Sequence, residues 1–581
     1  MKEARTLLFF LCQMTVALLC AVSSDDSNAV SVSLLATLTV ELSLLCALLL
    51  WLPARWSAVV RIALSVILYT LALTDLYCQT NFGTPLSPSI IGFILQTDIR
   101  EVIDFLSAFG FTLYKWSSVH VVILVILFHV VASVWLGRTP LAANLWTKLK
   151  PKKRTLAALW LLLVVACLPS AFALKQQYVE LLSQPTMNDM EGMVFRGYNR
   201  AANTPWWRLL YAIQGNRIAT HDIELQKATA RHVVVDSCTY RSPLIVLIIG
   251  ESYNRHHSQL YGYPLATTPR QVQRRDSGQL FVFTDVVTPW NITSNAFTQM
   301  VSLYHYGAPG QWGDYPLFPQ LFRRAGYQVV FFSNQFVRRW SGSGNQTGGF
   351  FLNDREVCDT LFDFRNRRKR QYDDRFLRQC RREYETHTDT TLVICHLMGQ
   401  HFEYANRYPS DSAHFTARDY RHRSLTDEQR RIVAAYDNAT RYNDHVIDLI
   451  LQQYSHRPAV VIHLSDHGEE CYDDLPVHGR LYTPLEPRQV RQEFEIPFWI
   501  WCSPSYQTAH PDVVERIRAA TRRPFMTDQL PHMLLWLAGI SCPYYEASHD
   551  LLSPAFDTRR PRLLEGTTDY DELILRKKPR H

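Results

Sequence analysis

The stretch VVIHLSDHGEE, residues 460–470, decides the fold, because a run of β-branched apolar residues ends abruptly at Asp466, His467 and Gly468. Fully apolar runs of this length are typical of strands in parallel sheets that helices cover on both faces. In such sheets ligands gather beyond the carboxyl ends of the strands. The titratable residues that follow this run are therefore predicted to face a functional site.

Similar runs recur on both sides of this stretch and are separated by amphipathic segments. They are SPLIVLIIGES (242–252), LFVFTDVVT (280–288), GYQVVFFSNQ (326–335), TLVICHLMGQH (391–401) and EIPFWIWCS (495–503). Apolar strands that alternate with helices indicate an α/β fold. We expect residues 241–581 to form an α/β/α domain with a mostly parallel sheet.

The first 174 residues differ from the rest, because they hold nearly every long uncharged run. A helix needs ~20 apolar residues to cross ~30 Å of hydrocarbon, and only a helix satisfies its own backbone hydrogen bonds in lipid. The first run could instead be a cleaved signal peptide. Five membrane helices are predicted, at Leu7–Val22, Val32–Leu52, Ser57–Leu76, Val119–Leu136 and Leu156–Leu174.

The basic residues between these helices predict the orientation. Arg55 and Arg61 lie between the second and third helices, and a basic cluster (138–154) lies between the fourth and fifth, whereas the first loop carries Asp25 and Asp26. The excess of positive charge on cytoplasmic loops then places everything after residue 174 outside the cytoplasm. We expect a membrane domain (1–174), a helical connector (175–240) and an extracytoplasmic catalytic domain (241–581), for which nucleic acid is not an expected partner.

Seven of the twelve cysteines lie in the extracytoplasmic part. An oxidising compartment permits disulfides, although their connectivity cannot be read from a sequence. Cys358 and Cys380 are the candidate local pair.

Four polar residues follow three of the apolar runs directly: Glu251, His401, Asp466 and His467. Carboxylate oxygens and neutral imidazole nitrogens are ligands of Zn²⁺, which binds them at ~2.0–2.2 Å. A lone histidine at a strand end is more often a satisfied structural residue. Four such residues at one edge of a sheet predict a metal site.

A series of motifs resembles a known family. GESYNRHHSQLYGYPLATTPR (250–270), VVTPWNITSNAF (286–297), HLMGQHFEYANRYP (396–409), YDNATRYNDHVI (436–447), SDHGEE (465–470), VHGR (477–480) and TDQLPHMLLWLAGI (527–540) occur in this order. The series is similar to the phosphoethanolamine transferases of Gram-negative inner membranes, in the alkaline phosphatase and sulfatase superfamily. That family also has five membrane helices before a periplasmic catalytic domain, so the resemblance covers nearly the whole chain.

The resemblance implies roles for particular residues. It implies that Glu251, Asp466, His467 and a nucleophilic threonine hold one zinc ion tightly, with a second ion as an option. Thr293 is the best match for that threonine, with Thr288, Ser294 and Thr298 as alternatives. His401 and His478 match histidines that contact the phosphoryl group or a second metal, and Asn254 is a further expected substrate contact.

The family's reaction moves phosphoethanolamine from phosphatidylethanolamine to lipopolysaccharide through a phosphoethanolamine-threonine intermediate. Here GQHFEY (399–404) replaces the GSHGPTY of many members that modify lipid A, and the first motif lacks their GETAR. Both differences favour the branch that modifies core heptose or its phosphate, with lipid A as the other acceptor.

Three other functions were weighed. A sulfatase needs a C/S-x-P-x-R motif, which we do not find after the first strand. A phosphoglycerol transferase shares the membrane layout and the threonine nucleophile, but the GES…YGYP and DNATRYND elements favour the ethanolamine branch. A non-catalytic membrane scaffold on a degenerate phosphatase fold is disfavoured because Glu251, Thr293, Asp466 and His467 are all present.

Overall fold

The chain divides into two compact units between Thr220 and His221 in the computed structural model. The structure describes residues 1–23, 32–82, 86–91 except 89, 118–139, 153–190 except 188, 204–336, 350–384, 390–481 and 485–575, together with Trp146 and Met193.

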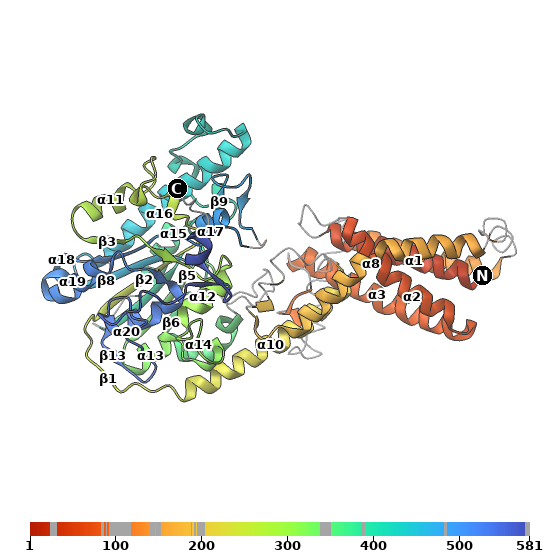
Figure 1. Ribbon diagram of the computed structural model, residues 1–581, viewed down its shortest axis with the longest axis horizontal. Coiled ribbons are helices and arrows are strands. Elements are labelled where there is room, and N and C mark those ends of the chain that lie inside the picture. The colour runs from red at the N-terminus through yellow and green to blue at the C-terminus, as the bar shows by residue number, and fades with distance from the viewer. Residues whose placement is uncertain are drawn as a thin grey trace. The chain divides into compact units, whose positions relative to one another are not determined.

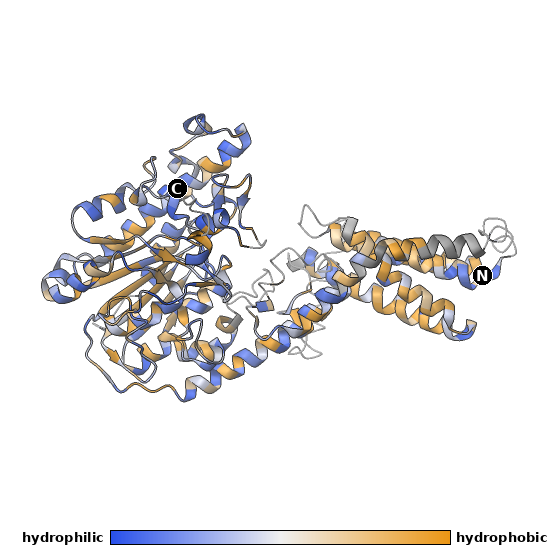
Figure 2. Cartoon of the chain, in the orientation of Figure 1, coloured by the Kyte–Doolittle hydropathy of each residue, from blue (hydrophilic) through white to orange (hydrophobic). Residues whose placement is uncertain are grey.

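The N-terminal unit is helical, and every predicted membrane stretch lies in a helix. These are α1 (Lys2–Val22), α2 (Val32–Trp51), α3 (Ala54–Phe82), α6 (Ser118–Arg138) and α8 (Lys153–Ser183), followed by α10 (Pro205–Arg231). Within the described residues, α1, α2, α3 and α6 are long and apolar enough to cross a membrane. Figure 2 shows apolar residues along these helices. The fifth span, in α8, stays a prediction.

Two carboxylates inside this unit, those of Glu41 and Asp75, have polar partners. Glu41 of α2 accepts hydrogen bonds from the Tyr178 hydroxyl at 2.9 Å and the Trp206 indole at 3.0 Å. Asp75 of α3 pairs with Arg208 of α10 at 2.5 Å, and both side chains are buried. Because an unpaired charge among apolar helices is costly, these partners tie the start of α10 to the bundle.

The second unit is built on a sheet of seven strands in the order β3-β11-β8-β2-β7-β5-β6 (Figure 1). Four neighbouring pairs are parallel, whereas β11 is antiparallel to both β3 and β8, so the sheet is mixed. All six predicted apolar runs contain one of these strands. Their bounds are β2 (Leu244–Gly250), β3 (Leu280–Phe283), β5 (Gln328–Ser333), β6 (Phe364–Arg365), β7 (Thr391–His396), β8 (Ala459–Ser465) and β11 (Phe498–Cys502).

Helices cover both faces of the sheet. Because alternate residues of a strand point to opposite faces, each strand contributes side chains to two separate cores. In β2, Ile245, Leu247 and Ile249 belong to one buried core with residues of α12, α13, α19 and α20. Val246 and Ile248 belong to a second core with α15 and α16. Strand β2 is therefore apolar at every position, as the sequence indicated. The helices of the two layers are α12 (Thr293–Val301), α13 (Phe318–Arg324), α14 (Arg355–Leu361), α15 (Asp373–Glu383), α16 (Asp427–Tyr454), α19 (Pro511–Ala520) and α20 (Leu530–Ala538).

Smaller elements complete the unit. Two-residue strands form four short pairs: β1 (Ser237–Cys238) with β13 (Ile540–Ser541), β4 (Val286–Val287) with β12 (Phe525–Met526), β9 (Glu470–Cys471) with β10 (His478–Gly479), and β14 (Leu563–Leu564) with β15 (Thr568–Asp569). The remaining α-helices are α11 (Pro269–Asp276), α17 (Pro487–Glu493), α18 (Pro504–Ala509) and α21 (Tyr570–Leu575).

The candidate disulfide between Cys358 and Cys380 is wrong. Both cysteines carry free thiols. Cys380 of α15 is buried in the core on one face of the sheet, whereas Cys358 of α14 packs against the core on the other face. Proximity in sequence was misleading because the sheet separates the two helices.

Candidate active site

The site forms where β2 and β8 end. These strands are adjacent and parallel, and Gly250 pairs with Ser465 at their carboxyl ends. Glu251 and Asp466 are the next residues of each chain segment, so the register sets the two carboxylates side by side. Ser252 adopts a positive φ of 55°, and its N–H donates to Asp466 Oδ1 at 3.0 Å.

The two carboxylate oxygens of Asp466 differ, because Oδ1 accepts hydrogen bonds and Oδ2 accepts none within the described residues. Its Oδ1 accepts the N–H groups of Ser252 at 3.0 Å and His467 at 2.7 Å. Its Oδ2 is buried, has no hydrogen-bond partner within the described residues, and lies 3.2 Å from His467 Nε2. A buried carboxylate oxygen without a partner is costly, and a cation is the group that satisfies it.

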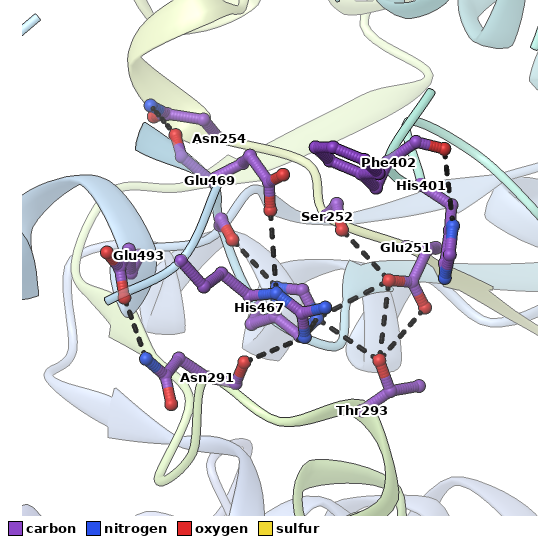
Figure 3. A network of polar contacts seen from close by, with 12 residues as sticks. Glu251, Ser252, Asn254, Asn291, Thr293, His401, Phe402, His467, Glu469 and Glu493 are labelled. Atoms are coloured by element: carbon purple, nitrogen blue, oxygen red, sulfur yellow. Dashed lines mark hydrogen bonds and ion pairs between the residues drawn. The ribbon is translucent and has the colours of Figure 1, made fainter. Parts of the chain in front are cut away.

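Thr293 is the hydroxyl that reaches this cluster (Figure 3). Its Oγ1 lies 3.3 and 3.2 Å from the two carboxylate oxygens of Glu251 and 3.2 Å from His467 Nε2. Thr293 is also the first residue of α12, where backbone N–H groups lack intrahelical acceptors and the helix dipole favours negative charge.

The alternative hydroxyls are bonded elsewhere. Thr288 donates to Trp290 O at 3.2 Å and Thr298 to Ser294 O at 2.9 Å. Ser294 donates to the side chain of Asn295 at 3.2 Å.

The spacing of the donor atoms fits a metal ion. His467 Nε2 lies 3.4 Å from Glu251 Oε1, and the other contacts among Glu251, Thr293, Asp466 and His467 measure 3.2–3.3 Å. Ligands at ~2.0–2.2 Å in a tetrahedron lie roughly 3.3–3.6 Å from one another. Two carboxylates, one imidazole and one hydroxyl therefore form a donor set suited to Zn²⁺.

The imidazole of His467 is held in the form that a metal requires. Its Nδ1 donates to Gly468 O at 2.7 Å, so the Nε2 lone pair faces the cluster, where the Arg480 guanidinium approaches it at 2.9 Å. Burial and the charge of Arg480 lower the pKa of His467. Burial, and then the charge of Glu251, raises the pKa of Asp466. The lowered pKa of His467 and the raised pKa of Asp466 both indicate a cluster that a bound cation would stabilise.

The two histidines expected to contact the phosphoryl group, His401 and His478, lie in different surroundings. His401 lies beside Glu251 (Figure 3), and its Nδ1 is 3.4 Å from Phe402 O; burial lowers its pKa. His478 lies farther out, stacked on the Phe402 ring at 5.9 Å and bonded to the Tyr472 hydroxyl at 2.8 Å.

Asn254 is not among the side chains brought to the cluster. It is fully buried, and its amide bonds Glu469 O and Gln492 Oε1, both at 2.8 Å, and accepts from His256 N at 2.8 Å. These contacts hold the Asn254 amide in place, and its expected contact with substrate stays a prediction.

Three contributors were not predicted from the sequence. Gln335 donates to Glu251 Oε2 at 2.8 Å, and it ends the apolar run 326–335, a position that could have revealed it. Arg480 also donates to Asn291 O at 3.0 Å. Gly399 has a φ of 48°, and a Cβ there would lie 2.8 Å from Glu251 O, so only glycine fits.

Comparisons with known proteins identify relatives over most of the chain. Phosphoethanolamine transferase EptC of Escherichia coli (strain K12) is 25% identical over 532 residues, which cover 89% of this chain and 87% of that protein. Phosphoethanolamine transferase CptA of Salmonella typhimurium is 25% identical over 538 residues, with the same two coverages of 89% and 87%. The predicted resemblance is thereby confirmed.

A solved structure extends the likeness in fold to both units. The integral membrane protein lipooligosaccharide phosphoethanolamine transferase A (EptA) from Neisseria meningitidis matches with a TM-score of 0.50 and 18% identity, over 94% of this chain and 97% of that one. Residues 243–540, more than half of the chain, match the Sulfatase family model. The chain therefore belongs to the sulfatase family, with its metal-type cluster at the ends of β2 and β8 and the start of α12.

Proposed function

We propose that this protein is a zinc-dependent phosphoethanolamine transferase that moves phosphoethanolamine from phosphatidylethanolamine to lipopolysaccharide, with core heptose or its phosphate as the favoured acceptor and lipid A as the other. The observation that carries the proposal is the contact of Thr293 Oγ1 with Glu251 and His467, 3.2–3.3 Å away, beside the orphaned Asp466 Oδ2. The named relatives support the choice of transferred group.

The residues that would hold zinc are Glu251, Thr293, Asp466 and His467. When bound, zinc lowers the pKa of a coordinated hydroxyl and neutralises charge that develops on phosphoryl oxygens. The chain supplies the rest: Gln335 fixes the orientation of Glu251, and Gly468 O fixes the tautomer of His467.

In the first half-reaction, Thr293 Oγ1, already deprotonated, forms a bond to the donor phosphorus, and the bond from phosphorus to the diacylglycerol oxygen breaks. The first N–H groups of α12 and the Arg480 guanidinium are positioned to bind the phosphoryl oxygens as they gain charge. His401 is the group proposed to deliver a proton to the departing diacylglycerol oxygen.

In the second half-reaction, an acceptor oxygen attacks the phosphorus of phosphoethanolamine-Thr293 and releases the Thr293 oxygen. His401 would then accept the acceptor's proton, which restores the starting state. His478, stacked on Phe402, is proposed to bind the incoming substrate or a second metal ion.

The proposed location is the inner membrane, with five membrane helices that include α8 and with the catalytic domain in the periplasm. The proposed division is membrane domain 1–174, connector 175–240 and catalytic domain 241–581. The membrane helices would keep the catalytic domain attached to the membrane that contains the lipid donor.

Mass spectrometry of lipopolysaccharide from cells with and without the protein tests the proposal. Wild type should add the mass of one phosphoethanolamine unit to core or lipid A, and Thr293→Ala should add none. Thr298→Ala, one turn along the same helix, should keep activity because its hydroxyl bonds only within α12. Retained activity in Thr293→Ala would exclude the threonine mechanism, and a phosphoglycerol adduct would identify the alternative transferase.

A further inference from the structure

A second cluster of metal-type side chains lies in the α/β unit and shares no residue with the candidate active site. It consists of His305, Glu546 and His549, whose donor atoms all lie within 4.8 Å of one another. His305 follows the end of α12 at Val301, and the other two residues follow β13 near the C-terminus. The cluster therefore joins two segments that are far apart in sequence.

The distances in the cluster suit a shared cation better than hydrogen bonds. Glu546 Oε1 lies 3.5 Å from His305 Nε2, and the other carboxylate oxygen, Oε2, lies 3.4 Å from His549 Nε2. These separations exceed the 2.7–3.2 Å that is usual for N–H···O bonds, and they match the roughly 3.3–3.6 Å between ligands of tetrahedral zinc. The rings of His305 and His549 are only 3.8 Å apart between centroids, so two positive charges there would repel strongly.

Neighbouring groups orient both imidazoles with Nε2 toward the cluster. His305 Nδ1 lies 3.4 Å from Tyr306 O, an acceptor for its N–H. His549 Nδ1 lies 2.9 Å from the Gln529 side-chain amide, whose oxygen and nitrogen are interchangeable in assignment. With the Gln529 oxygen facing His549, Nδ1 donates and Nε2 is free to bind a metal, which is the usual arrangement around a metal-ligating histidine.

A buried histidine beside the cluster, His532, gives independent support for a bound ion. His532 is fully buried, and its ring lies 6.2 Å from that of His305 and 5.5 Å from that of His549. Its Nδ1 accepts the Glu546 N–H at 3.1 Å, so its Nε2 carries the proton. That Nε2–H has no hydrogen-bond partner in the part of the chain that the structure describes. A water or anion that completes the coordination of a bound metal would supply the missing acceptor.

We propose that His305, Glu546 and His549 bind a divalent transition metal of the zinc type, with the fourth position taken by water or an anion. Two imidazoles and one carboxylate are ligands that zinc accepts. The histidine side chains are 11% exposed and that of Glu546 is 50% exposed, so the ion would enter from the Glu546 side. The bound ion fastens the segment after α12, the helix that begins with Thr293, to the C-terminal segment.

The test uses full-length protein in detergent with Asp466→Asn and His467→Gln in place, so that the proposed active-site zinc does not contribute. Equilibrium dialysis against Zn²⁺ should give one bound ion per chain, and Co²⁺ should give visible d–d absorption. In this background His305→Gln or Glu546→Gln should abolish both signals. Gln529→Leu should weaken zinc binding by roughly 10–100-fold. His456→Gln, an exposed histidine, should change nothing.

The controls separate loss of the metal site from loss of the fold. Circular dichroism and the melting temperature in chelator verify that every variant folds, and the half-exposed Glu546 keeps a mild substitution available. Equal zinc affinity in the background protein, in Glu546→Gln and in His305→Gln would overturn the site. Failure of the transferase test with Thr293→Ala would leave this result untouched, because the two readouts share no residue.

Discussion

Gly250 and Ser465 are paired at the ends of the adjacent parallel strands β2 and β8, and this pairing sets Glu251 beside Asp466. A slip of one residue between the strands would turn every side chain of one strand to the opposite face of the sheet. The candidate metal cluster therefore depends on the register of two central strands whose residues are all buried.

Asp466→Asn should be more stable than wild type without zinc and less stable than wild type with zinc. The amide keeps the shape of the side chain and can still accept from Ser252 N and His467 N. In chelator the variant should unfold at a higher temperature than wild type, because one of two adjacent buried negative charges is gone. Zinc at 1,000 times its dissociation constant should stabilise wild type by about 4 kcal/mol and the variant far less. Calorimetry with and without zinc measures both effects.

Asp444→Asn is the matched control, since Asp444 is also buried and accepts two backbone N–H groups, from Arg270 and Gln271. Its response to zinc should equal that of wild type. A zinc response in Asp466→Asn as large as that of wild type would remove Asp466 from the ligand set.

Arg480→Ala should raise zinc affinity while lowering the transfer rate. The Arg480 guanidinium lies 2.9 Å from His467 Nε2, the atom proposed to bind zinc, so it competes with the ion until the ion displaces it. Once displaced, its charge is available to phosphoryl oxygens, and its loss should cost roughly 10²–10³-fold in kcat. Zinc titration and transfer assays measure the two changes.

Arg441→Ala serves as the comparison, because that side chain donates to Ala266 O on an exposed part of the unit. It should leave zinc affinity and rate unchanged. If Arg480→Ala and Arg441→Ala behave alike, Arg480 has no part in phosphoryl binding.

His257 should make stability fall at alkaline pH. Its Nδ1 lies 2.5 Å from Asp437 and its Nε2 2.8 Å from Asp473. Burial alone would lower the pKa of His257, but the charges of Asp473 and Asp437 outweigh it and raise the pKa to about 10. A raised pKa gives stability that is fully present below the unfolded value of about 6.5 and is lost as the pH rises through 10.

Denaturant unfolding from pH 6 to 10 tests this dependence. His257→Gln should lose about 3–5 kcal/mol near pH 7, as expected when one partner of a buried ion pair is removed, and should show a flatter pH profile. His422→Gln, an exposed histidine, should follow wild type. Parallel profiles for wild type and His257→Gln would contradict the buried imidazolium.

Asp75→Asn should destabilise the helical unit, because it removes the carboxylate charge that faces the buried Arg208 guanidinium. The expected loss is about 3–5 kcal/mol, and Asp75→Leu combined with Arg208→Met should lose less than the two single changes together. Thermal unfolding in detergent measures these values. Glu224→Gln, which breaks an exposed pair with Lys227, should cost under about 1 kcal/mol. Strict additivity in the Asp75–Arg208 cycle would show that the pair is not coupled.

The strands and the central cluster could be predicted because both follow from local patterns. Apolar runs mark strands buried on two faces, and parallel strands bring their carboxyl ends to one edge, so Glu251, Asp466 and His467 meet. Strand direction is not encoded in the same pattern, which is why the antiparallel β11 was not predicted.

Other features depend on contacts that no local pattern carries. Arg480 and Gln335 reach the cluster from the loops after β10 and β5, and His305, Glu546 and His549 meet only through tertiary packing. The separation of Cys358 from Cys380 depends on which face of the sheet each helix covers. These placements require the folded chain.

The backbone of Gly399 leaves no room for a side chain against Glu251. The start of the loop that carries His401 is therefore fixed, whereas positions 400 and 402 already differ between GQHFEY here and the GSHGPTY of many family members. New acceptor preferences among relatives should accordingly arise by exchange of residues such as Phe402, while position 399 stays invariant across otherwise divergent chains.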